Sequence, residues 1–311
     1  MTTRDKTSSL SSALHPVYWP TWLGLGLLRL IALLPYPLQW TFGHMLGILI
    51  WLLPIPQKRF IRINLKLCFP ELSHNDRKKM LFHNCLSMGM SLIEIAMSWW
   101  SSDRHLQKLV KIDGLEYLQQ ALEKQHGVIL LSAHFTTLEI GGRLLSLHAP
   151  FHVMYRDQKN AAFNYLMTRA RQRNYNKAIH RNNIRGLLQS LKANMPVWYA
   201  PDQHFGSKQP VFAPFFNIPA ASNPATSRLA KNTGAAIVPL FQQRLPGLGG
   251  YRIELFPSLH EFPTDNIDND TATINLALEK LIRLCPEQYL WAHRRFKSQQ
   301  DNPSKNIYNE E

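Results

Sequence analysis

Short apolar runs alternate with amphipathic segments over most of the chain. In the runs 127–132, 196–200 and 235–241 nearly every residue is apolar, which is typical of buried strands. Between such runs lie longer segments with the mixed apolar and polar pattern of helices that bury one face. Strands that alternate with helices predict an α/β fold with a mixed or mostly parallel sheet. The last helix is expected at about 270–284.

The first 57 residues carry a different pattern, because they are apolar and almost uncharged. Residues 7–28 and 30–57 contain no charged side chain, and only Arg29 separates them. The segment 18–37 approaches the roughly 20 apolar residues that a membrane-spanning helix needs, with tyrosines and tryptophans near its ends. We therefore expect a membrane anchor in residues 1–57, with one span at about 18–37.

The charges around this anchor predict its orientation. Lys58, Arg59, Arg62 and Lys66 follow it, whereas only Arg4 and Lys6 precede it. The positive-inside rule then keeps the rest of the protein on the cytoplasmic side. Two alternatives stay open: an apolar hairpin that lies in the membrane interface, and a buried pair of helices in a soluble protein.

The remaining chain divides into a folded domain at 58–297 and a polar tail at 298–311. A long helix is expected to begin after Ser73, since Asp76 three residues further on completes a pattern similar to a capping box. Cys68, Cys85 and Cys285 are far apart, which argues against a disulfide framework and a cysteine zinc site.

His134 and Glu139 are candidate catalytic residues, because they follow the apolar run 127–131. Active sites in open α/β sheets lie at the carboxyl ends of strands. On one continuous helix the two side chains would point about 140° apart, so they can meet only if His134 precedes the helix. Glu139 could then accept a hydrogen bond from one imidazole nitrogen and leave the other as a base. Since the chain has 13 histidines, the pattern could also be incidental.

Basic residues form the second candidate feature. The chain has 35 lysines and arginines against 21 acids, and a formal net charge of +14. The segment 155–208 has only two acids, Asp157 and Asp202, against ten basic residues: Arg156, Lys159, Arg169, Arg171, Arg173, Lys177, Arg181, Arg185, Lys192 and Lys208. Such a bias favours an anionic partner, either phosphates or an acidic protein.

Asp202 is the third candidate, because it follows the apolar run 196–200 in WYAPDQHFG. It either belongs to the same carboxyl edge as His134 or forms an ordinary Pro-Asp turn.

Several other kinds of catalytic site are excluded because their motifs are absent from the sequence. The chain has no G-x-S-x-G, no P-loop, no G-x-G-x-x-G and no H-E-x-x-H. It also lacks a helix-turn-helix or RNP signature of a nucleic-acid-binding protein.

Taken together and in order, these segments resemble a known family. The segments are NLKLCFPELS at 64–73, the H-x4-E pair, YRD at 155–157, TRARQRNYNKAIHRNNIRG at 168–186, WYAPDQHFG at 198–206, FAPFF at 212–216 and PEQYLWAHRRFK at 286–297. They resemble the late acyltransferases of lipid A biosynthesis in Gram-negative bacteria, and most closely the lauroyl type. Asp157 is a departure, since the family commonly has proline there.

The resemblance implies an αβα layered domain similar to glycerol-phosphate acyltransferases, with an N-terminal membrane helix. It implies transfer of a fatty acyl chain, lauroyl here, from acyl carrier protein to a Kdo-bearing tetraacyl lipid A precursor. The site would lie at the cytoplasmic face of the inner membrane. The partners would be acyl carrier protein, a phosphorylated glycolipid and the membrane, with no cofactor, metal or nucleic acid.

By motif matching, His134, Glu139, Arg171 and Asp202 would be the catalytic residues. We expect His134 to act as a base on a hydroxyl group, with Glu139 stabilising the imidazolium. Arg171 could stabilise the oxyanion or hold a lipid phosphate, and Asp202 could orient Arg171 or the acceptor. Two other functions stay open: a hydrolase of thioesters or lipids with the same His/Glu pair, and a non-enzymatic basic binding module.

Overall fold

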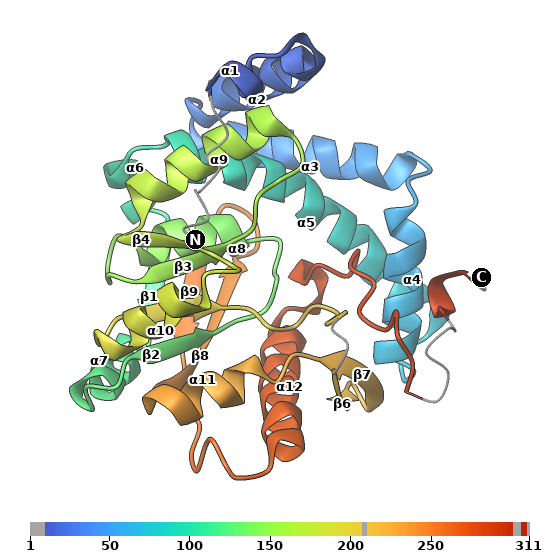
Figure 1. Cartoon of the computed structure of the whole chain (residues 1–311). Coiled ribbons are helices and arrows are strands. Elements are labelled where there is room, and N and C mark those ends of the chain that lie inside the picture. The colour runs from blue at the N-terminus through green and yellow to red at the C-terminus, as the bar shows by residue number, and fades with distance from the viewer. Residues whose placement is uncertain (1–9, 207–209, 301–305, 310–311) are drawn as a thin grey trace.

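A seven-stranded mixed sheet forms the centre of the computed structural model, which describes residues 10–206, 210–300 and 306–309 (Figure 1). The strand order is β1-β9-β8-β2-β5-β3-β4, and every neighbouring pair is parallel except β8 and β9. The strands are β1 (Val110–Asp113), β2 (Val128–Leu131), β3 (His152–Tyr155), β4 (Lys177–His180), β5 (Pro196–Tyr199), β8 (Ala236–Arg244) and β9 (Tyr251–Leu255). The predicted α/β fold is confirmed. Arg4, Lys6 and Lys208 lie outside the described residues.

Helices cover both faces of this sheet. The helices of the described residues are α1 (Leu10–Ala13), α2 (Trp19–Ala32), α3 (Tyr36–Leu52), α4 (Gln57–Cys68), α5 (His74–Trp100), α6 (Asp103–Gln107), α7 (Leu115–Glu123), α8 (Leu138–Leu145), α9 (Ala161–Asn174), α10 (Ile184–Lys192), α11 (Ala225–Thr233) and α12 (Ile267–Leu284), with 3-10 turns η1 (Pro16–Tyr18), η2 (Pro286–Gln288) and η3 (Ile307–Asn309). α12 matches the predicted last helix, and Ser73 caps α5 by accepting from the Asp76 N–H at 3.1 Å.

The central strand β2 shows how the three layers are held together. All four of its residues are buried, and successive side chains of a strand point to opposite faces. Val128 and Leu130 pack into the cluster that includes side chains of α7 and α8. Ile129 and Leu131 pack into the cluster on the other face, which includes side chains of α10 and α12. The result is an αβα arrangement.

A separate hairpin is formed by β6 (Val211–Phe215) and β7 (Ile218–Ser222), which pair antiparallel and pack against α12. Phe216 and Asn217 connect the strands, both with positive φ (52° and 61°), the backbone of a tight two-residue turn. In the polar tail, Tyr308 is buried, and its hydroxyl donates to Oδ1 of Asn64 on α4 at 2.5 Å.

The N-terminal apolar region is helical, but the structure differs from the predicted continuous span at 18–37. α2 has 14 residues and ends at Ala32, and a new helix begins at Tyr36, after Pro35. At about 1.5 Å per residue α2 is roughly 21 Å long, shorter than a membrane core of about 30 Å. Pro35, in the turn between the two helices, explains the break, because proline disfavours a helical residue before it.

Among the described residues, one helix and one bent pair of helices are apolar and long enough to cross a membrane. α5 has 27 residues, but 56% of its apolar window is buried inside the protein. α3 and α4 reach the required length only together, and they meet at an angle of 87°. α3 packs closely on α5, where a side chain at Gly89 would collide with the backbone of Gly47.

Candidate active site

His134 lies in the turn between β2 and α8, at the carboxyl edge of the parallel strands. β2 ends at Leu131 and α8 begins at Leu138, so His134 precedes the helix, as predicted. Asp202 follows β5, which pairs with β2 along its length. Because the two strands are parallel, they bring the imidazole and the carboxylate to the same edge.

The His134 imidazole and the Asp202 carboxylate form a hydrogen-bonded pair. Nδ1 of His134 lies 2.6 Å from Oδ1, and the His134 backbone N–H donates to Oδ2 at 3.1 Å. The Tyr289 hydroxyl also donates to Oδ2, at 2.9 Å. An acceptor on Nδ1 keeps the proton there, which leaves Nε2 as the basic nitrogen of the ring.

Burial and charge act in opposite directions on this pair. Burial would lower the pKa of His134, but the adjacent Asp202 carboxylate outweighs it and raises this pKa above its ordinary value. Burial would raise the pKa of Asp202, but His134 and the donated hydrogen bonds lower it to about 2. The Asp202 side chain is fully buried, whereas the His134 side chain is 28% exposed. Asp202 therefore stays ionised while the imidazole can reach a substrate.

Glu139 and Arg171 form the second pair of the site. Arg171, on α9, donates to Glu139, on α8, through Nε at 3.2 Å and Nη2 at 2.6 Å. Both side chains are 15% exposed, and the Trp99 indole donates to Glu139 Oε1 at 3.5 Å. Burial would raise the pKa of Glu139, but Arg171 outweighs it and lowers this pKa. Glu139 is therefore an ionised carboxylate that is occupied by a guanidinium.

The structure corrects two predicted contacts. The carboxylate on the imidazole is Asp202 and not Glu139, because β5 is the immediate neighbour of β2 in the sheet. Glu139, at the second position of α8, instead bonds Arg171 of α9. The expectation that Asp202 could orient Arg171 is wrong, because Asp202 bonds His134 and Arg171 bonds Glu139. All four predicted site residues nevertheless belong to these two hydrogen-bonded pairs.

Sequence reasoning missed Tyr289 and Trp99. Tyr289 lies in the PEQYLWAHRRFK segment, about 150 residues from His134, and reaches Asp202 through a bridge between its backbone and that of Phe135. Trp99 lies at the end of a long apolar helix, where tryptophan usually indicates core packing. The periodicity of the sequence contains no signal for either contact.

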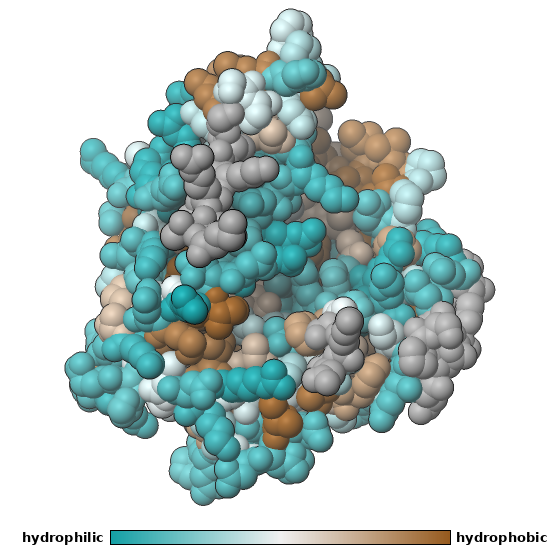
Figure 2. Space-filling view, viewed as in Figure 1, coloured by the Kyte–Doolittle hydropathy of each residue, from teal (hydrophilic) through white to brown (hydrophobic). Residues whose placement is uncertain are grey.

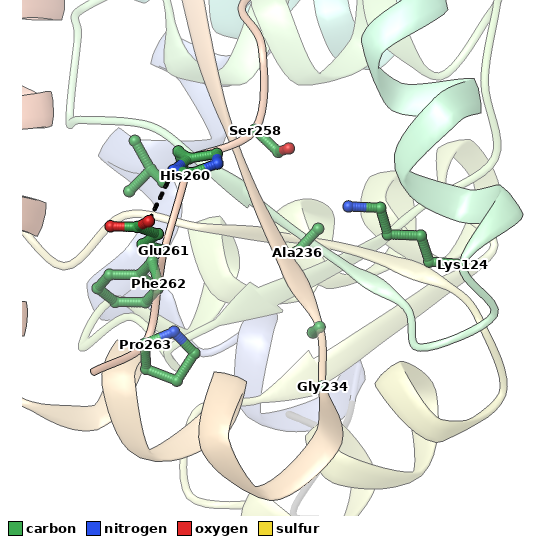
Figure 3. Close-up of a pocket in the computed structure, with 10 residues that line it drawn as sticks. Lys124, Gly234, Ala236, Ser258, His260, Glu261, Phe262 and Pro263 are labelled. Atoms are coloured by element: carbon green, nitrogen blue, oxygen red, sulfur yellow. Dashed lines mark ion pairs between the residues drawn. The ribbon is translucent and has the colours of Figure 1, made fainter. Parts of the chain in front are cut away.

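A pocket of about 440 Å³ lies away from these residues, and Figure 3 shows the side chains that line it. It is lined by Lys124, by residues 234–236 and by residues 258–263. Gly234 precedes β8, so this pocket is at the amino edge of the parallel strands, opposite to His134. Within the described parts of the chain, no group of three or more His, Cys, Asp or Glu side chains could hold a metal ion.

Fold and site together define an α/β protein with a partly exposed histidine held by a buried aspartate. The family model for bacterial lipid A biosynthesis acyltransferases matches residues 7–298. With this match over nearly the whole chain, the protein belongs to that family of enzymes.

Three relatives from Escherichia coli strain K12 carry different acyl groups in their names. The chain is 36% identical to lipid A biosynthesis lauroyltransferase, over 98% of this chain and 100% of that protein. It is 39% identical to lipid A biosynthesis palmitoleoyltransferase, over 92% of this chain and 93% of that protein. It is 29% identical to lipid A biosynthesis myristoyltransferase, over 89% of this chain and 86% of that protein.

Among solved structures, the 1-acyl-sn-glycerophosphate acyltransferase from Thermotoga maritima aligns with a TM-score of 0.36 and 12% identity. The alignment covers 78% of this chain and 97% of that chain. A TM-score this low is insufficient for an argument about fold or function.

Proposed function

We propose that this enzyme transfers a lauroyl chain from acyl carrier protein to a hydroxyacyl group of a Kdo-bearing tetraacyl lipid A precursor. Membership of the lipid A acyltransferase family supports the acceptor class. The observation that carries the chemistry is the His134–Asp202 pair at 2.6 Å, with a partly exposed imidazole. This pair is suited to deprotonating an alcohol beside a thioester.

In this mechanism His134 Nε2 takes the proton of the acceptor hydroxyl as its oxygen attacks the thioester carbonyl. Asp202 stabilises the imidazolium that forms. The tetrahedral intermediate then collapses, the carbon–sulfur bond breaks, and the leaving thiolate takes the proton from His134. General base catalysis of this kind supplies roughly 10²- to 10⁴-fold of rate.

We propose that Arg171 stabilises the oxyanion that develops on the thioester carbonyl. Glu139 occupies Nε and Nη2 of the guanidinium, so Nη1 lies outside the ion pair. A fixed donor aimed at developing charge is worth roughly 10²- to 10³-fold. We therefore assign Arg171 to the oxyanion and Glu139 to holding Arg171 in place.

Four exposed basic residues form a basic rim at the carboxyl edge of the sheet: Arg156, Lys159, Arg181 and Arg185. Arg156 and Lys159 follow β3, and the other two follow β4. β3 and β4 lie two and three strands from β2, which places the rim roughly 10–15 Å from the strand that carries His134. We propose that the basic rim binds the acidic acyl carrier protein while the acceptor lies nearer the membrane.

The exposed apolar faces of α2 and α3 would bring the enzyme to its lipid acceptor. Leu23, Leu27, Leu30 and Leu33 are each at least 60% exposed, and α3 exposes Leu52 at 71%. Figure 2 shows hydrophobic side chains gathered over α1 and α2 at the top of the molecule and beside α3. A surface of this kind is typical of helices that lie in a membrane interface. We propose that α2 and α3 dock as a hairpin on the cytoplasmic face of the inner membrane.

The test uses the full chain in detergent, thioesters of acyl carrier protein with several chain lengths, and the tetraacyl lipid acceptor. We expect mass spectrometry to show a gain of one acyl chain that is lost in His134→Ala. The preferred thioester reports the chain length, which the names of the relatives leave open between lauroyl, myristoyl and palmitoleoyl. Release of free fatty acid without acylated lipid would instead identify a hydrolase that uses water at the same base.

A further inference from the structure

Residues 286–290 form a strap behind the loop that carries His134. The Leu290 backbone N–H donates to the His134 carbonyl at 2.9 Å, and the Thr136 N–H donates to the Gln288 carbonyl at 2.7 Å. The side chain of Tyr289, in the same strap, donates to Asp202. The strap therefore holds the backbone of His134 and the carboxylate of Asp202 together.

The Gln288 side chain attaches this strap to the end of β8. Its Oε1 accepts from the Arg244 backbone N–H, and its Nε2 donates to the Arg244 carbonyl, both at 2.8 Å. The residue is only 6% exposed. The carbonyl and the amino group of this amide both bond the backbone of one residue, Arg244. The amide is therefore fixed in position and in orientation, because a rotation that exchanges its oxygen and nitrogen would break both hydrogen bonds.

Arg244 is itself immobilised by a buried ion pair. Its guanidinium donates to Glu94 of α5 at 2.7 Å and 3.1 Å, and both side chains are less than 10% exposed. Its Nη1 also lies 3.4 Å from the Ser87 hydroxyl, which contacts the Thr136 hydroxyl at 2.6 Å. The pair therefore reaches the loop of His134 by a second route, through Ser87.

A buried ion pair of this kind is a poor source of net stability, because removing two charges from water costs about as much as their attraction returns. A role in fixing geometry accounts better for its position between α5, β8 and the strap. None of Glu94, Arg244 and Gln288 bonds the His134 ring or the Asp202 carboxylate; their contacts reach those groups through the strap and Thr136.

We propose that Gln288 is a positioning residue for the His134–Asp202 pair, anchored by the Glu94–Arg244 ion pair. This inference rests on the acyl transfer proposed above. If Gln288 is removed, the strap can shift relative to β8, and the imidazole moves from the line of attack. A misplacement of about 1 Å can cost roughly 100-fold in rate, whereas substrate binding need not change.

The experiment compares Gln288→Leu with Asn275→Leu in the full chain, with lauroyl-acyl carrier protein and the tetraacyl lipid acceptor. Asn275 is a matched control: it is a buried amide that donates to the Pro214 carbonyl at 2.9 Å and to the Ser222 hydroxyl at 3.0 Å, and these hydrogen bonds do not involve the strap. We expect both variants to have a lower Tm. At a temperature well below both Tm values, Gln288→Leu should lower kcat by about 10- to 100-fold with KM within about twofold, while Asn275→Leu keeps the kcat of the native chain.

Equal kcat losses in the two variants, or an unchanged kcat in Gln288→Leu, would overturn the inference. If Gln288→Leu does not fold, Ser87→Ala decides, since it removes only the hydroxyl between Arg244 and Thr136. We expect a kcat loss of about threefold to tenfold there, and native kcat would count against the positioning role. A native chain that is active and is silenced by His134→Ala keeps the proposed function intact in either case. If the native chain itself transfers no acyl group, both proposals fail.

Discussion

Each of the two carboxylates of the site is bonded to one partner side chain. Asp202 bonds the imidazole of His134, and Glu139 bonds the guanidinium of Arg171 in a bidentate arrangement. A charge-assisted pair with two hydrogen bonds is geometrically specific. The two carboxylates are therefore not interchangeable, and substitutions at them should fail in different ways.

Asp202→Asn should remove the base function. An asparagine amide can donate to Nδ1, which would place the imidazole proton on Nε2 and block proton abstraction. We expect kcat to fall by roughly 10²- to 10⁴-fold, measured as acylated lipid by mass spectrometry. Asp265→Asn is the control, because Asp265 is fully exposed and pairs only with the surface residue Lys231. Native kcat in Asp202→Asn would contradict the assignment of the base.

The pH profile tests the same pair independently. Asp202 raises the pKa of His134 above its ordinary value of about 6.5. A raised pKa means that the imidazole stays protonated to higher pH, so kcat/KM should fall as pH decreases, with a midpoint above 6.5. In the residual activity of Asp202→Asn this midpoint should move down, because burial alone lowers the pKa. A midpoint that does not move would show that another group controls the profile.

The Glu139–Arg171 pair should show strong coupling in a double-mutant cycle. Glu139→Ala leaves a nearly buried guanidinium without its carboxylate, which should cost about 3–5 kcal/mol of unfolding free energy. Removing Arg171 as well should restore part of that loss, because no unpaired charge remains. Urea unfolding of the two single variants and the double variant measures this. Additive losses would mean that the two side chains do not act as a pair.

For single residues, the sequence was sufficient to predict the candidate site residues but not which of them contact one another. His134 and Asp202 could be predicted because each follows an apolar strand. Their contact depends on the strand order, in which β5 is next to β2, and one sequence does not show that order. Tyr289 reaches the site through long-range backbone pairing, which leaves no local pattern.

At the scale of elements, the carboxyl ends of β3 and β4 determine where the basic rim lies. The ten basic residues predicted as one stretch have different positions: Arg171 is in the buried pair, Lys177 begins β4, and Lys192 ends α10. Since parallel strands share one carboxyl edge, residues that directly follow a strand lie on the side of His134. Sequence spacing alone could not make this division.

Arg156→Ala with Arg181→Ala should weaken donor binding without harming the chemistry. We expect KM for the acyl-carrier-protein thioester to rise by about tenfold, kcat to stay within about twofold, and the effect to shrink as salt increases. Lys177→Ala with Lys192→Ala removes the same charge at the amino edge of the sheet and is the matched control. An equal rise of KM in the control would show that net charge matters and not the basic rim.

The α/β pattern was predictable because strands and amphipathic helices bury their apolar residues with different periods. The break between α2 and α3 was harder to predict, since an apolar run with prolines fits both a kinked span and two helices. The turn is held by the buried Gln39 amide, which donates to the Ala32 carbonyl at 3.0 Å and the Leu34 carbonyl at 2.7 Å. These hydrogen bonds give partners to the carbonyl groups at the end of α2 and so stabilise two separate helices in place of one continuous helix.

At the scale of the whole molecule, helix α2 is packed directly against α9, the helix that carries Arg171. Leu25 of α2 is buried against Trp99, Met167 and Ala170, one residue before Arg171 on α9. Asn160, the N-cap of α9, donates to the Thr21 hydroxyl of α2 at 2.8 Å. The helices that would contact lipid therefore also support the helix that carries Arg171, so the active site lies close to the proposed membrane surface.

A hairpin in the interface and a helix across the bilayer differ in how firmly they hold the protein. Leu23, Leu27 and Leu30 are exposed along one face of α2, so we expect the full chain to float with vesicles of phosphatidylethanolamine and phosphatidylglycerol. Alkaline carbonate should release at least part of it, which a transmembrane helix would resist. Leu23→Glu with Leu27→Glu should abolish flotation, because two charges in the contact face oppose insertion, whereas Leu276→Glu, an exposed leucine on α12, should not. Complete retention in carbonate would favour a spanning anchor, and it would require α2 and α3 to rearrange from the two short helices of this fold into one continuous helix.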